Sequence, residues 1–412
     1  MFEKSAIRIL AIDDDPFMLK LLECMLAQQG YASVSTSDNG KAAIESFASP
    51  NQAPDLILLD LNMPEMDGIE FVRHLVERQY SGSLILISGE DERTLQSTEK
   101  LVRTYGIPAL GHLSKPVNPE DLSLLLEKWT PSSLSVPQMS KTAYGAMEVH
   151  AAIANGELVN FYQPKVNIAS GKVVGVESLV RWRHPRDGMV YPDQFIGIAE
   201  QYGLIDDLTR VVIHEAFAQA KAWQDSGLNL HVAINISMDN LASLEFADYI
   251  VAAAAAADIK PEGIVLEVTE SLLMKNLSTP LDVLTRLRLK RFSLSIDDFG
   301  TGHSSLSQLR DLPFDELKVD RGFVHGAVED STLRAIYSAS LSLAKQLGMK
   351  TVAEGVEDRA DWDFLRSTGC DLAQGYFIAK PMPAHEIPGW IAAWEAHIEN
   401  LIENVFVHSL EM

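Results

Sequence analysis

The sequence predicts an α/β protein with two domains: a flavodoxin-like, doubly wound domain and an irregular (β/α)8 barrel of the TIM type with one antiparallel strand. Three observations predict this. The 412 residues exceed what one hydrophobic core usually serves. Short apolar runs alternate with amphipathic helical stretches, which is typical of sheets covered by helices. A run rich in Ser, Thr and Pro separates five such apolar runs from eight more.

The first domain is predicted to span residues 1–129, and the linker residues 130–144. The predicted strands of this domain cover residues 7–13, 32–38, 56–61, 84–88 and 109–114. Helix candidates such as residues 16–30 lie between these strands, so the sheet should be parallel, with helices on both faces.

The second domain is predicted to span residues 145–412. Its eight apolar runs cover residues 161–166, 173–180, 231–237, 263–269, 292–298, 315–320, 350–356 and 370–377. Eight strands with helical crossovers suit a closed barrel, because closure removes both sheet edges. The first two runs are joined by only six residues, NIASGK, which is too short for a parallel crossover. That pair should therefore form an antiparallel hairpin.

The composition indicates a cytoplasmic protein. A formal net charge of −23 disfavours nucleic acid and anionic lipid, because both are bound through Lys and Arg, so we expect neither DNA nor membrane as a partner. The first residues lack the apolar core of a secretory signal, and the longest apolar run is far shorter than the roughly 20 residues that cross a bilayer. Cys24 and Cys370 lie far apart in apolar segments and are expected to be reduced core thiols.

Four predicted strands of the first domain end in polar residues. Asp13 and Asp14 end the first strand, Asp60 the third and Ser88 the fourth, and Lys115 follows the fifth. In an open parallel sheet these ends share one edge. Carboxylates there suit a hard cation such as Mg²⁺, while Ser and Lys suit a phosphoryl group on Asp60. Helix capping by these acids is the alternative interpretation.

The strand ends of the second domain carry a larger set of polar residues. In order, they are Glu177, Asn235, Glu267, Asp297, Asp298, Lys318, Glu354, Glu357 and Gln374. Carboxylates that face one barrel mouth would repel one another without cations, and oxygen ligands are what Mg²⁺ and Mn²⁺ prefer. Two clustered ions suit in-line attack of water on a phosphoester. Each acid taken singly could instead be a solvated rim residue.

The adjacent pair Asp297 and Asp298 imposes a condition on the backbone. Neighbours on a strand point to opposite faces, so both can contact metal only if regular β geometry ends there, and the following FGTG supplies that freedom. As a phosphate cradle the lone GTG is a weak signal, because no G-x-x-x-x-G-K follows. Near this site, Arg181 could clamp a phosphate oxygen and Lys318 could orient the attacking water.

The first domain resembles the receiver domain of two-component response regulators over residues 5–128. The resemblance rests on Asp13, Asp14, Asp60, Ser88 and Lys115 and on LNMPEMDG after Asp60. It implies that Asp60 accepts phosphate from a histidine kinase or phosphotransfer protein, that the three acids hold Mg²⁺, and that Ser88 and Lys115 sense the phosphoryl group. One departure is His112, where the family usually has an aromatic residue that moves on phosphorylation.

The second domain resembles the EAL domain, the cyclic di-GMP phosphodiesterase module, over residues 145–400. The resemblance rests on Glu177-Ser178-Leu179, followed by Arg181, and on DDFG-x-G at 297–302, K-x-D at 318–320 and EGVE at 354–357. It implies an enzyme that hydrolyses cyclic di-GMP to linear pGpG with two Mg²⁺ or Mn²⁺ ions. It also implies regulation through Asp60 and assembly as a homodimer or larger homo-oligomer. Two departures are Ser178 for the usual Ala and His303 for the usual Tyr.

The EAL resemblance also assigns roles to individual residues. The implied metal ligands are Glu177, Asn235, Glu267, Asp297, Asp298 and Glu354, with Asp297 as a candidate bridge between the ions. Lys318 would contact the catalytic water, and Glu354 is the candidate to activate it. The residues implied in binding the substrate or ordering the rim are Gln163, Leu179, Arg181, Glu357 and Gln374. Glu270 would hold the DDFGTG loop in place.

Three alternatives come from other classes of protein. A cyclic di-GMP receptor without catalysis should lack one of the metal positions, and this chain has all of them. A Mg²⁺-dependent lyase of the enolase type needs a Lys or His base, whereas acids far outnumber bases at this rim. A DNA-binding regulator needs a basic recognition helix, and the sequence has none.

Overall fold

The computed structural model describes residues 4, 7–46, 53–78, 80–90, 92–129, 144–270, 278–301, 309–310 and 312–408. Contacts between residues divide the chain into two compact units, Met1–Lys141 and Thr142–Met412. All of the predicted linker except Tyr144 lies outside the described residues, as do Gly302 and His303.

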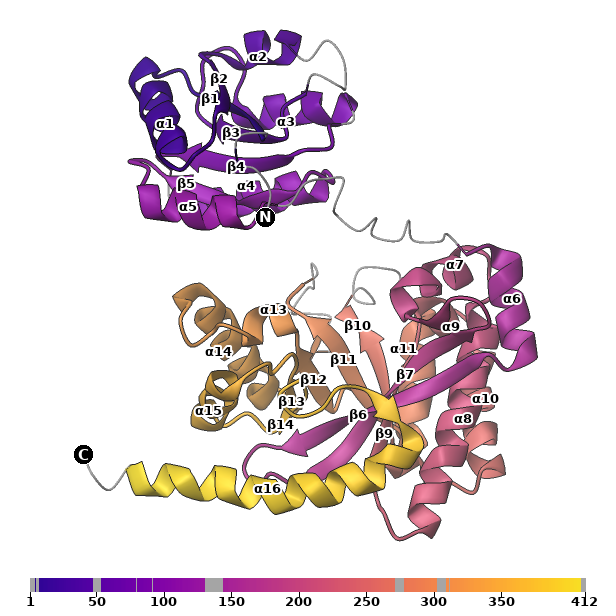
Figure 1. Cartoon of the computed structure of the whole chain (residues 1–412). Coiled ribbons are helices and arrows are strands. Elements are labelled where there is room, and N and C mark those ends of the chain that lie inside the picture. Colours follow the sequence, from indigo (N-terminus) through magenta and orange to yellow (C-terminus); the bar gives the residue numbers. More distant parts are fainter. Residues whose placement is uncertain are drawn as a thin grey trace. The chain divides into compact units, whose positions relative to one another are not determined.

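The first unit is a five-stranded parallel sheet with helices on both faces (Figure 1). Its strand order is β2-β1-β3-β4-β5, so all five predicted strands are present. The elements are β1 (Arg8–Ile12), α1 (Pro16–Gln28), β2 (Ser33–Ser37), α2 (Gly40–Ser46), β3 (Leu56–Asp60), α3 (Gly68–Glu77), β4 (Ser83–Ser88), α4 (Glu92–Thr104), β5 (Ala109–Ser114) and α5 (Pro119–Glu127).

Alternating residues of the central strands supply two apolar cores, one on each face of this sheet. On β3, Leu56 and Leu58 pack with helices α1 and α5, while Ile57 and Leu59 pack with α2, α3 and α4. Because successive side chains on a strand point to opposite faces, a strand that is apolar throughout must be covered on both sides. The predicted doubly wound arrangement is thus confirmed.

The second unit is a closed eight-stranded barrel of mixed direction. Strands β6, β7, β9, β10, β11, β12, β13 and β14 follow one another around it, and a β6–β7 pairing closes the ring. Strand β6 is antiparallel to both neighbours, β7 and β14, whereas the remaining neighbours in the ring pair in parallel. The eight predicted strands and the antiparallel hairpin are confirmed.

Helices surround the barrel (Figure 1). The strands and their connections are α6 (Ala146–Asn155), β6 (Leu158–Asn167), β7 (Val173–His184), β8 (Gly188–Val190), α7 (Ile196–Gln201), α8 (Ile205–Asp225), β9 (His231–Asn235), α9 (Met238–Leu241), α10 (Glu245–Ala256), β10 (Ile264–Thr269), α11 (Ser278–Leu289), β11 (Ser293–Phe299), β12 (Glu316–Val319), α13 (Arg321–Val324), α14 (Ser331–Gln346), β13 (Lys350–Ala353), α15 (Arg359–Thr368), β14 (Leu372–Ala373), β15 (Met382–Pro383) and α16 (Ile387–His408). The short strands β8 and β15 were not predicted.

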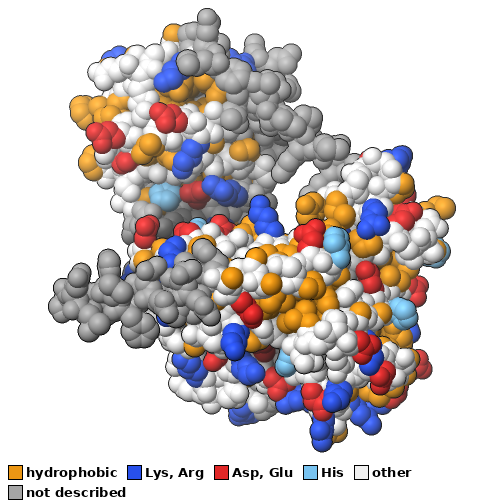
Figure 2. Space-filling model, turned by 60° about the horizontal axis from the view of Figure 1, so that its bottom comes forward, with side chains coloured by type: hydrophobic (Ala, Val, Ile, Leu, Met, Phe, Trp, Pro, Cys, Tyr) orange, Lys and Arg blue, Asp and Glu red, His pale blue; other side chains and the backbone are white. Residues whose placement is uncertain are grey.

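The structure also bears on what the sequence predicted for the cysteines, the charges and membrane spans. Cys370 is buried as expected, but Cys24 is exposed on α1, so the prediction of two core thiols was wrong for Cys24. Acidic and basic side chains are interspersed over the face of the second unit shown in Figure 2. Among the described helices, none combines the length and the apolar character that a membrane span requires.

Candidate active site

The carboxyl-terminal mouth of the barrel gathers polar side chains from successive strands. They are Glu177 on β7, Asn235 on β9, Glu267 on β10, Asp297 and Asp298 on β11, Lys318 on β12, Glu354 directly after β13 and Gln374 directly after β14. The carboxyl ends of parallel strands surround one opening, so residues far apart in the chain meet there.

Lys318 lies at the centre of this group and is completely buried. Its Nζ lies 2.7 Å from Glu354 Oε1, 2.9 Å from Glu267 Oε2 and 2.9 Å from Asp297 Oδ1. Glu177 Oε2 is farther away, at 3.5 Å. One ammonium group therefore lies near four carboxylates, so the cluster carries an excess of negative charge.

That excess appears in the pKa values of the acids. Burial, together with the charges of Asp297 and Glu177, raises the pKa of Glu354 to about 8 against the opposing effect of Lys318. Burial likewise raises the pKa of Glu177. Glu267 differs, because Lys165 and Lys318 outweigh its burial and hold its pKa at about 2. Added cations would reduce the electrostatic repulsion among the carboxylates of this cluster.

The acids form two overlapping groups of possible metal ligands. Glu177, Glu267 and Asp297 form one, with ligand atoms within 4.8 Å of one another, and Asp297, Asp298 and Glu354 form the other within the same limit. Asp297 belongs to both groups. Oxygen donors and uncompensated charge fit hard divalent cations.

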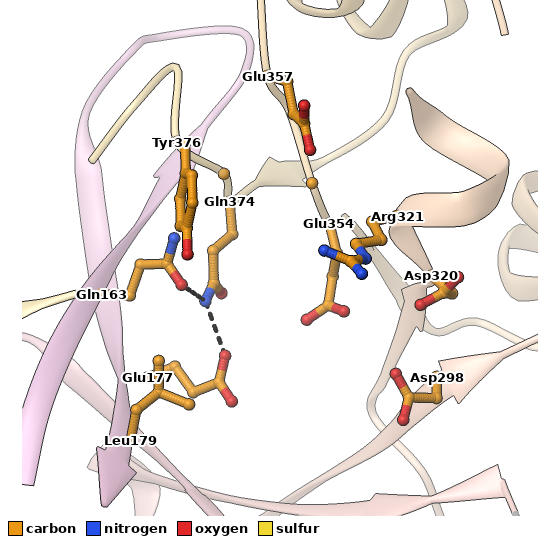
Figure 3. Close-up of a pocket in the computed structure, with 12 residues that line it drawn as sticks. Gln163, Glu177, Leu179, Asp298, Asp320, Arg321, Glu354, Glu357, Gln374 and Tyr376 are labelled. Atoms are coloured by element: carbon orange, nitrogen blue, oxygen red, sulfur yellow. Dashed lines mark hydrogen bonds between the residues drawn. The ribbon is translucent and has the colours of Figure 1, made fainter. Parts of the chain in front are cut away.

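Two amides brace the acid Glu177. Asn235 Nδ2 donates to Glu177 Oε1 at 2.7 Å, and Gln374 Nε2 donates to Glu177 Oε2 at 2.7 Å. Gln374 Nε2 also donates to Gln163 Oε1 at 2.9 Å, and Figure 3 shows this line of three side chains along one wall of the pocket. The donors fix the orientation of the carboxylate.

A pocket of about 260 Å³ opens over these groups. It is lined by Gln163, Glu177, Leu179, Asp298, Asp320, Arg321, Glu354, Gly355, Glu357, Gln374, Gly375 and Tyr376. The carboxylates of Glu177, Glu354 and Asp298 face the same space (Figure 3). A phosphorylated ligand in this pocket would meet the acids and any cations they hold.

The loop after β11 is tied to the end of β10. Glu270 Oε2 accepts a hydrogen bond from the backbone N–H of Gly300 at 2.8 Å. Gly300 has a φ of 101°, a conformation that glycine adopts without strain. This contact holds the segment that directly follows Asp297 and Asp298.

The first unit has its own acidic site at the carboxyl ends of its strands. Asp13, Asp14 and Asp60 have carboxylate oxygens within 4.8 Å of one another. Lys115 Nζ lies 2.8 Å from Asp13 Oδ2 and 2.8 Å from Asp60 Oδ2. Burial raises the pKa of Asp60, with a further contribution from Asp13, so Asp60 too lies where added positive charge would be favourable.

Neighbouring residues complete the surroundings of this second site. Ser88 is buried at the end of β4, and its Oγ accepts the backbone N–H of Glu90 at 3.2 Å. Asp15 caps helix α1 through the N–H of Phe17, so helix capping accounts for Asp15. His112 Nδ1 lies 2.8 Å from Glu99 Oε2 on α4.

Comparison with known families matches both units. The family model for the EAL domain matches residues 146–381, and the family model for the response regulator receiver domain matches residues 9–127. The chain belongs to the EAL domain family. Its receiver domain precedes the EAL domain, as the sequence resemblance predicted.

Relatives match the EAL domain alone or the whole chain. The cyclic di-GMP phosphodiesterase RocR of Pseudomonas aeruginosa is 32% identical over 92% of this chain and 96% of its own length. MucR of the same organism, a bifunctional diguanylate cyclase/cyclic di-GMP phosphodiesterase, is 40% identical over 60% of this chain and 36% of its own length. A solved structure of the MucR phosphodiesterase with c-di-GMP covers 58% of this chain and 98% of that chain, with a TM-score of 0.57.

Two residues of the EAL signature segment lie outside the pocket lining. Arg181, expected to clamp a phosphate, donates from Nη1 to the carbonyl of Val180 at 2.9 Å, and its guanidinium lies 5.1 Å from the ring centre of Tyr191. Burial lowers the pKa of Arg181. The hydroxyl of Ser178, in place of the usual Ala, is buried with no hydrogen-bond partner in the described part of the chain.

The sequence reasoning gave no role to several residues of the EAL site or its support. They include Lys165, which contacts Glu267 and Glu316, Glu316 itself, and the lining residues Asp320, Arg321 and Tyr376. A signal existed for Lys165, because it lies two residues after Gln163 on the same strand and therefore shares its face. Arg321 and Tyr376 directly follow the K-x-D and AQG motifs.

Proposed function

We propose that this chain is a response regulator whose EAL domain hydrolyses cyclic di-GMP to linear pGpG with two divalent ions, Mg²⁺ or Mn²⁺. Two lines of support come from relatives. RocR, named as a cyclic di-GMP phosphodiesterase, matches both domains over nearly its full length. The solved phosphodiesterase domain of MucR, at 40% identity, holds c-di-GMP.

The observation that carries the proposal is the pair of carboxylate groups that share Asp297. A shared ligand would place two cations side by side, which is the arrangement used by two-metal phosphoesterases. Glu177, Glu267, Asp298 and Glu354 would supply the remaining carboxylate ligands, and Asn235, which donates to Glu177, would add an amide oxygen. Such ions, when bound, would lower the pKa of a water and offset charge on the phosphodiester.

The protein groups then have separate roles in the hydrolysis. One water is added across a phosphodiester: its oxygen bonds to phosphorus, the sugar oxygen leaves with a proton, and the ring opens to a linear dinucleotide. Lys318 would hold the water and the acids in place, and Glu354, whose Oε1 lies 2.7 Å from Lys318 Nζ, is the carboxylate that would accept a proton from that water. Gln163, Leu179, Glu357 and Gln374 line the substrate pocket.

A receptor that binds cyclic di-GMP without cleaving it is the second candidate function. It has less support, because every carboxylate of the proposed metal set is present and lies within contact distance of the cluster. Binding and cleavage are separated directly by experiment.

The test is to incubate the purified full chain with cyclic di-GMP and Mg²⁺ or Mn²⁺ and to separate the nucleotides by chromatography. We expect pGpG from the wild type and none from Glu177→Ala or Glu177→Gln. Glu262→Gln, an exposed substitution before β10, serves as the matched control and should retain activity. Tight binding without product would favour the receptor.

The receiver domain is proposed to accept a phosphoryl group on Asp60 from a histidine kinase or phosphotransfer protein. Support comes from Lys115, which contacts both Asp13 and Asp60, and from the buried Ser88 nearby. Mg²⁺ would be held by Asp13, Asp14 and Asp60. Assembly as a homodimer or larger homo-oligomer stays a prediction, and sedimentation velocity with and without a phosphodonor would test it.

A further inference from the structure

A second buried lysine lies beneath the acidic cluster of the EAL domain. Lys165 is on β6, and only 4% of its surface is exposed. Its Nζ donates to Glu267 Oε1 at 2.6 Å and to Glu316 Oε1 at 3.0 Å. Lys165 does not line the pocket above the acids, and among them it contacts Glu267.

The two oxygens of Glu267 are held by different lysines. Oε1 is bound by Lys165, while Oε2 lies 2.9 Å from Lys318 in the cluster with Glu177 and Asp297. The Glu267 side chain is completely buried, so no water replaces a lost donor without rearrangement. Lys165 thereby prevents rotation of the carboxylate and leaves Oε2 directed at the cluster.

Lys165 is itself anchored on its other side. Glu316 Oε1 accepts Lys165 Nζ and also the hydroxyl of Ser295 at 3.1 Å, and Ser295 is fully buried. Lys165 and Glu316 also line a pocket of about 280 Å³ with His231 and Lys350, which begin β9 and β13. The anchor is therefore built at the amino-terminal end of the barrel, away from the substrate pocket.

We infer that Lys165, anchored by Glu316, is a positioning residue that presents Glu267 to a divalent cation in the active site. The inference rests on the proposed metal-dependent function. Charge alone would act in the opposite direction, because removing a lysine beside the cluster makes it more negative and more attractive to a cation. The direction of the effect therefore separates positioning from simple charge compensation.

The test compares Lys165→Met with Lys165→Gln in the full chain, with Mn²⁺ binding measured by calorimetry without substrate. Both variants remove one positive charge and have similar lengths, but only Gln keeps a hydrogen-bond donor for Glu267. We expect Lys165→Met to weaken Mn²⁺ binding by about 10- to 100-fold, as loss of a partner of a metal ligand typically does. Lys165→Gln should bind more tightly than Lys165→Met.

Controls separate the possible failures. Lys172→Met changes an exposed lysine in the turn after β6 and should bind Mn²⁺ like the wild type. Equal or tighter binding by Lys165→Met would overturn the inference. Absence of Mn²⁺ binding by the wild type would instead contradict the proposed metal-dependent function.

A second pair of variants keeps the inference testable if Lys165→Met does not fold. Glu316→Gln keeps an acceptor for Lys165 and Ser295, whereas Glu316→Leu removes it, and both remove the same charge. Weaker Mn²⁺ binding by Glu316→Leu than by Glu316→Gln would support positioning. Equal binding by the two would count against it.

Discussion

Asp297 and Asp298 are adjacent on β11, yet both carboxylates belong to one cluster with Glu354, with oxygens within 4.8 Å of one another. Regular β geometry would direct these neighbours to opposite faces. The chain departs from it at Asp298, whose φ is 55°, and the pairing of β11 with β12 shifts register between Ile296 and Phe299. A non-glycine residue with a left-handed backbone conformation is strained, and such strain is often found at functional sites.

Substitutions at Asp298 should separate its backbone role from its charge. Asn tolerates the left-handed conformation, so Asp298→Asn should melt like the wild type, while Asp298→Ala should lose about 1 kcal/mol of stability. Both should lower turnover at least about tenfold, because each removes a proposed metal ligand. Calorimetric melting and the chromatographic assay measure the two effects, and a wild-type rate for Asp298→Asn would contradict the ligand role.

The contact between Glu270 and Gly300 should matter for activity more than for stability. Glu270→Ala removes the acceptor for the Gly300 N–H and frees the segment after Asp298, so turnover should fall by about 100-fold. Glu270→Gln keeps a carbonyl acceptor and should retain most activity. The turnover rate and the melting curve of each variant are measured. Equal turnover of Glu270→Ala and Glu270→Gln would show that the hydrogen-bond acceptor for Gly300 is not required for activity.

The sequence predicted the strands well because runs rich in apolar residues are separated by helical stretches, and polar residues stand at or just after the ends of most of these runs. Even the irregular hairpin followed from six intervening residues, since chain length forbids a parallel crossover. The rim acids were predictable because strand ends share one mouth. The support beneath them was not: Lys165 comes from the antiparallel strand, whose amino-terminal half lies at the mouth, and its partner Glu316 begins β12.

The sequence also could not predict which neighbours the ends of long side chains contact. Arg181 follows the signature, and its guanidinium lies against the ring of Tyr191, from the segment after the unpredicted strand β8, while its role at a phosphate stays a prediction. A one-dimensional motif fixes which residue is present and which strand carries it. It does not fix which neighbour, supplied by a distant loop, the end of a flexible side chain contacts.

Close backbone packing after Gln374 should make Gly375 intolerant of a side chain. A Cβ there would lie 2.2 Å from both the N and the O of Val356, and backbone atoms have little freedom to move. Gly375→Ala should destabilise the EAL domain by about 1–3 kcal/mol. Gly197→Ala, at the second residue of α7, is the control: its added Cβ would meet no neighbouring element within 4 Å, so the variant should be as stable as the wild type. Urea unfolding followed by tryptophan fluorescence reports mainly on this domain. An unfolding midpoint of Gly375→Ala equal to that of the wild type would refute the clash.

Phosphorylation at Asp60 should change the catalytic rate of the EAL domain. A phosphoryl group would add charge where Asp60 already contacts Lys115 at 2.8 Å, and would give that lysine a new partner. Turnover of the wild type should therefore differ with and without a small-molecule phosphodonor and Mg²⁺, while Asp60→Asn should give one rate under both conditions. A wild-type rate unaffected by a donor that demonstrably labels the protein would oppose this coupling.

His325 should contribute stability that depends on pH. Its Nδ1 lies 2.9 Å from Asp361 Oδ2, and this hydrogen bond, together with the charges of Asp361, Glu357 and Asp358, raises the pKa of His325 above its ordinary value near 6.5. A pKa that is higher in the folded state means that folding favours the protonated ring. The contribution is therefore fully present below about pH 6.5 and is lost as the pH rises through the folded pKa.

The measurement is the difference in melting temperature between the wild type and His325→Gln from pH 5.5 to pH 9. We expect the wild type to be the more stable at the acidic end and the difference to shrink steadily toward the alkaline end. The ring is about half exposed, so the difference should be small and should weaken with added salt. A difference that stays constant across the range would mean that His325 contributes through packing and not through its charge.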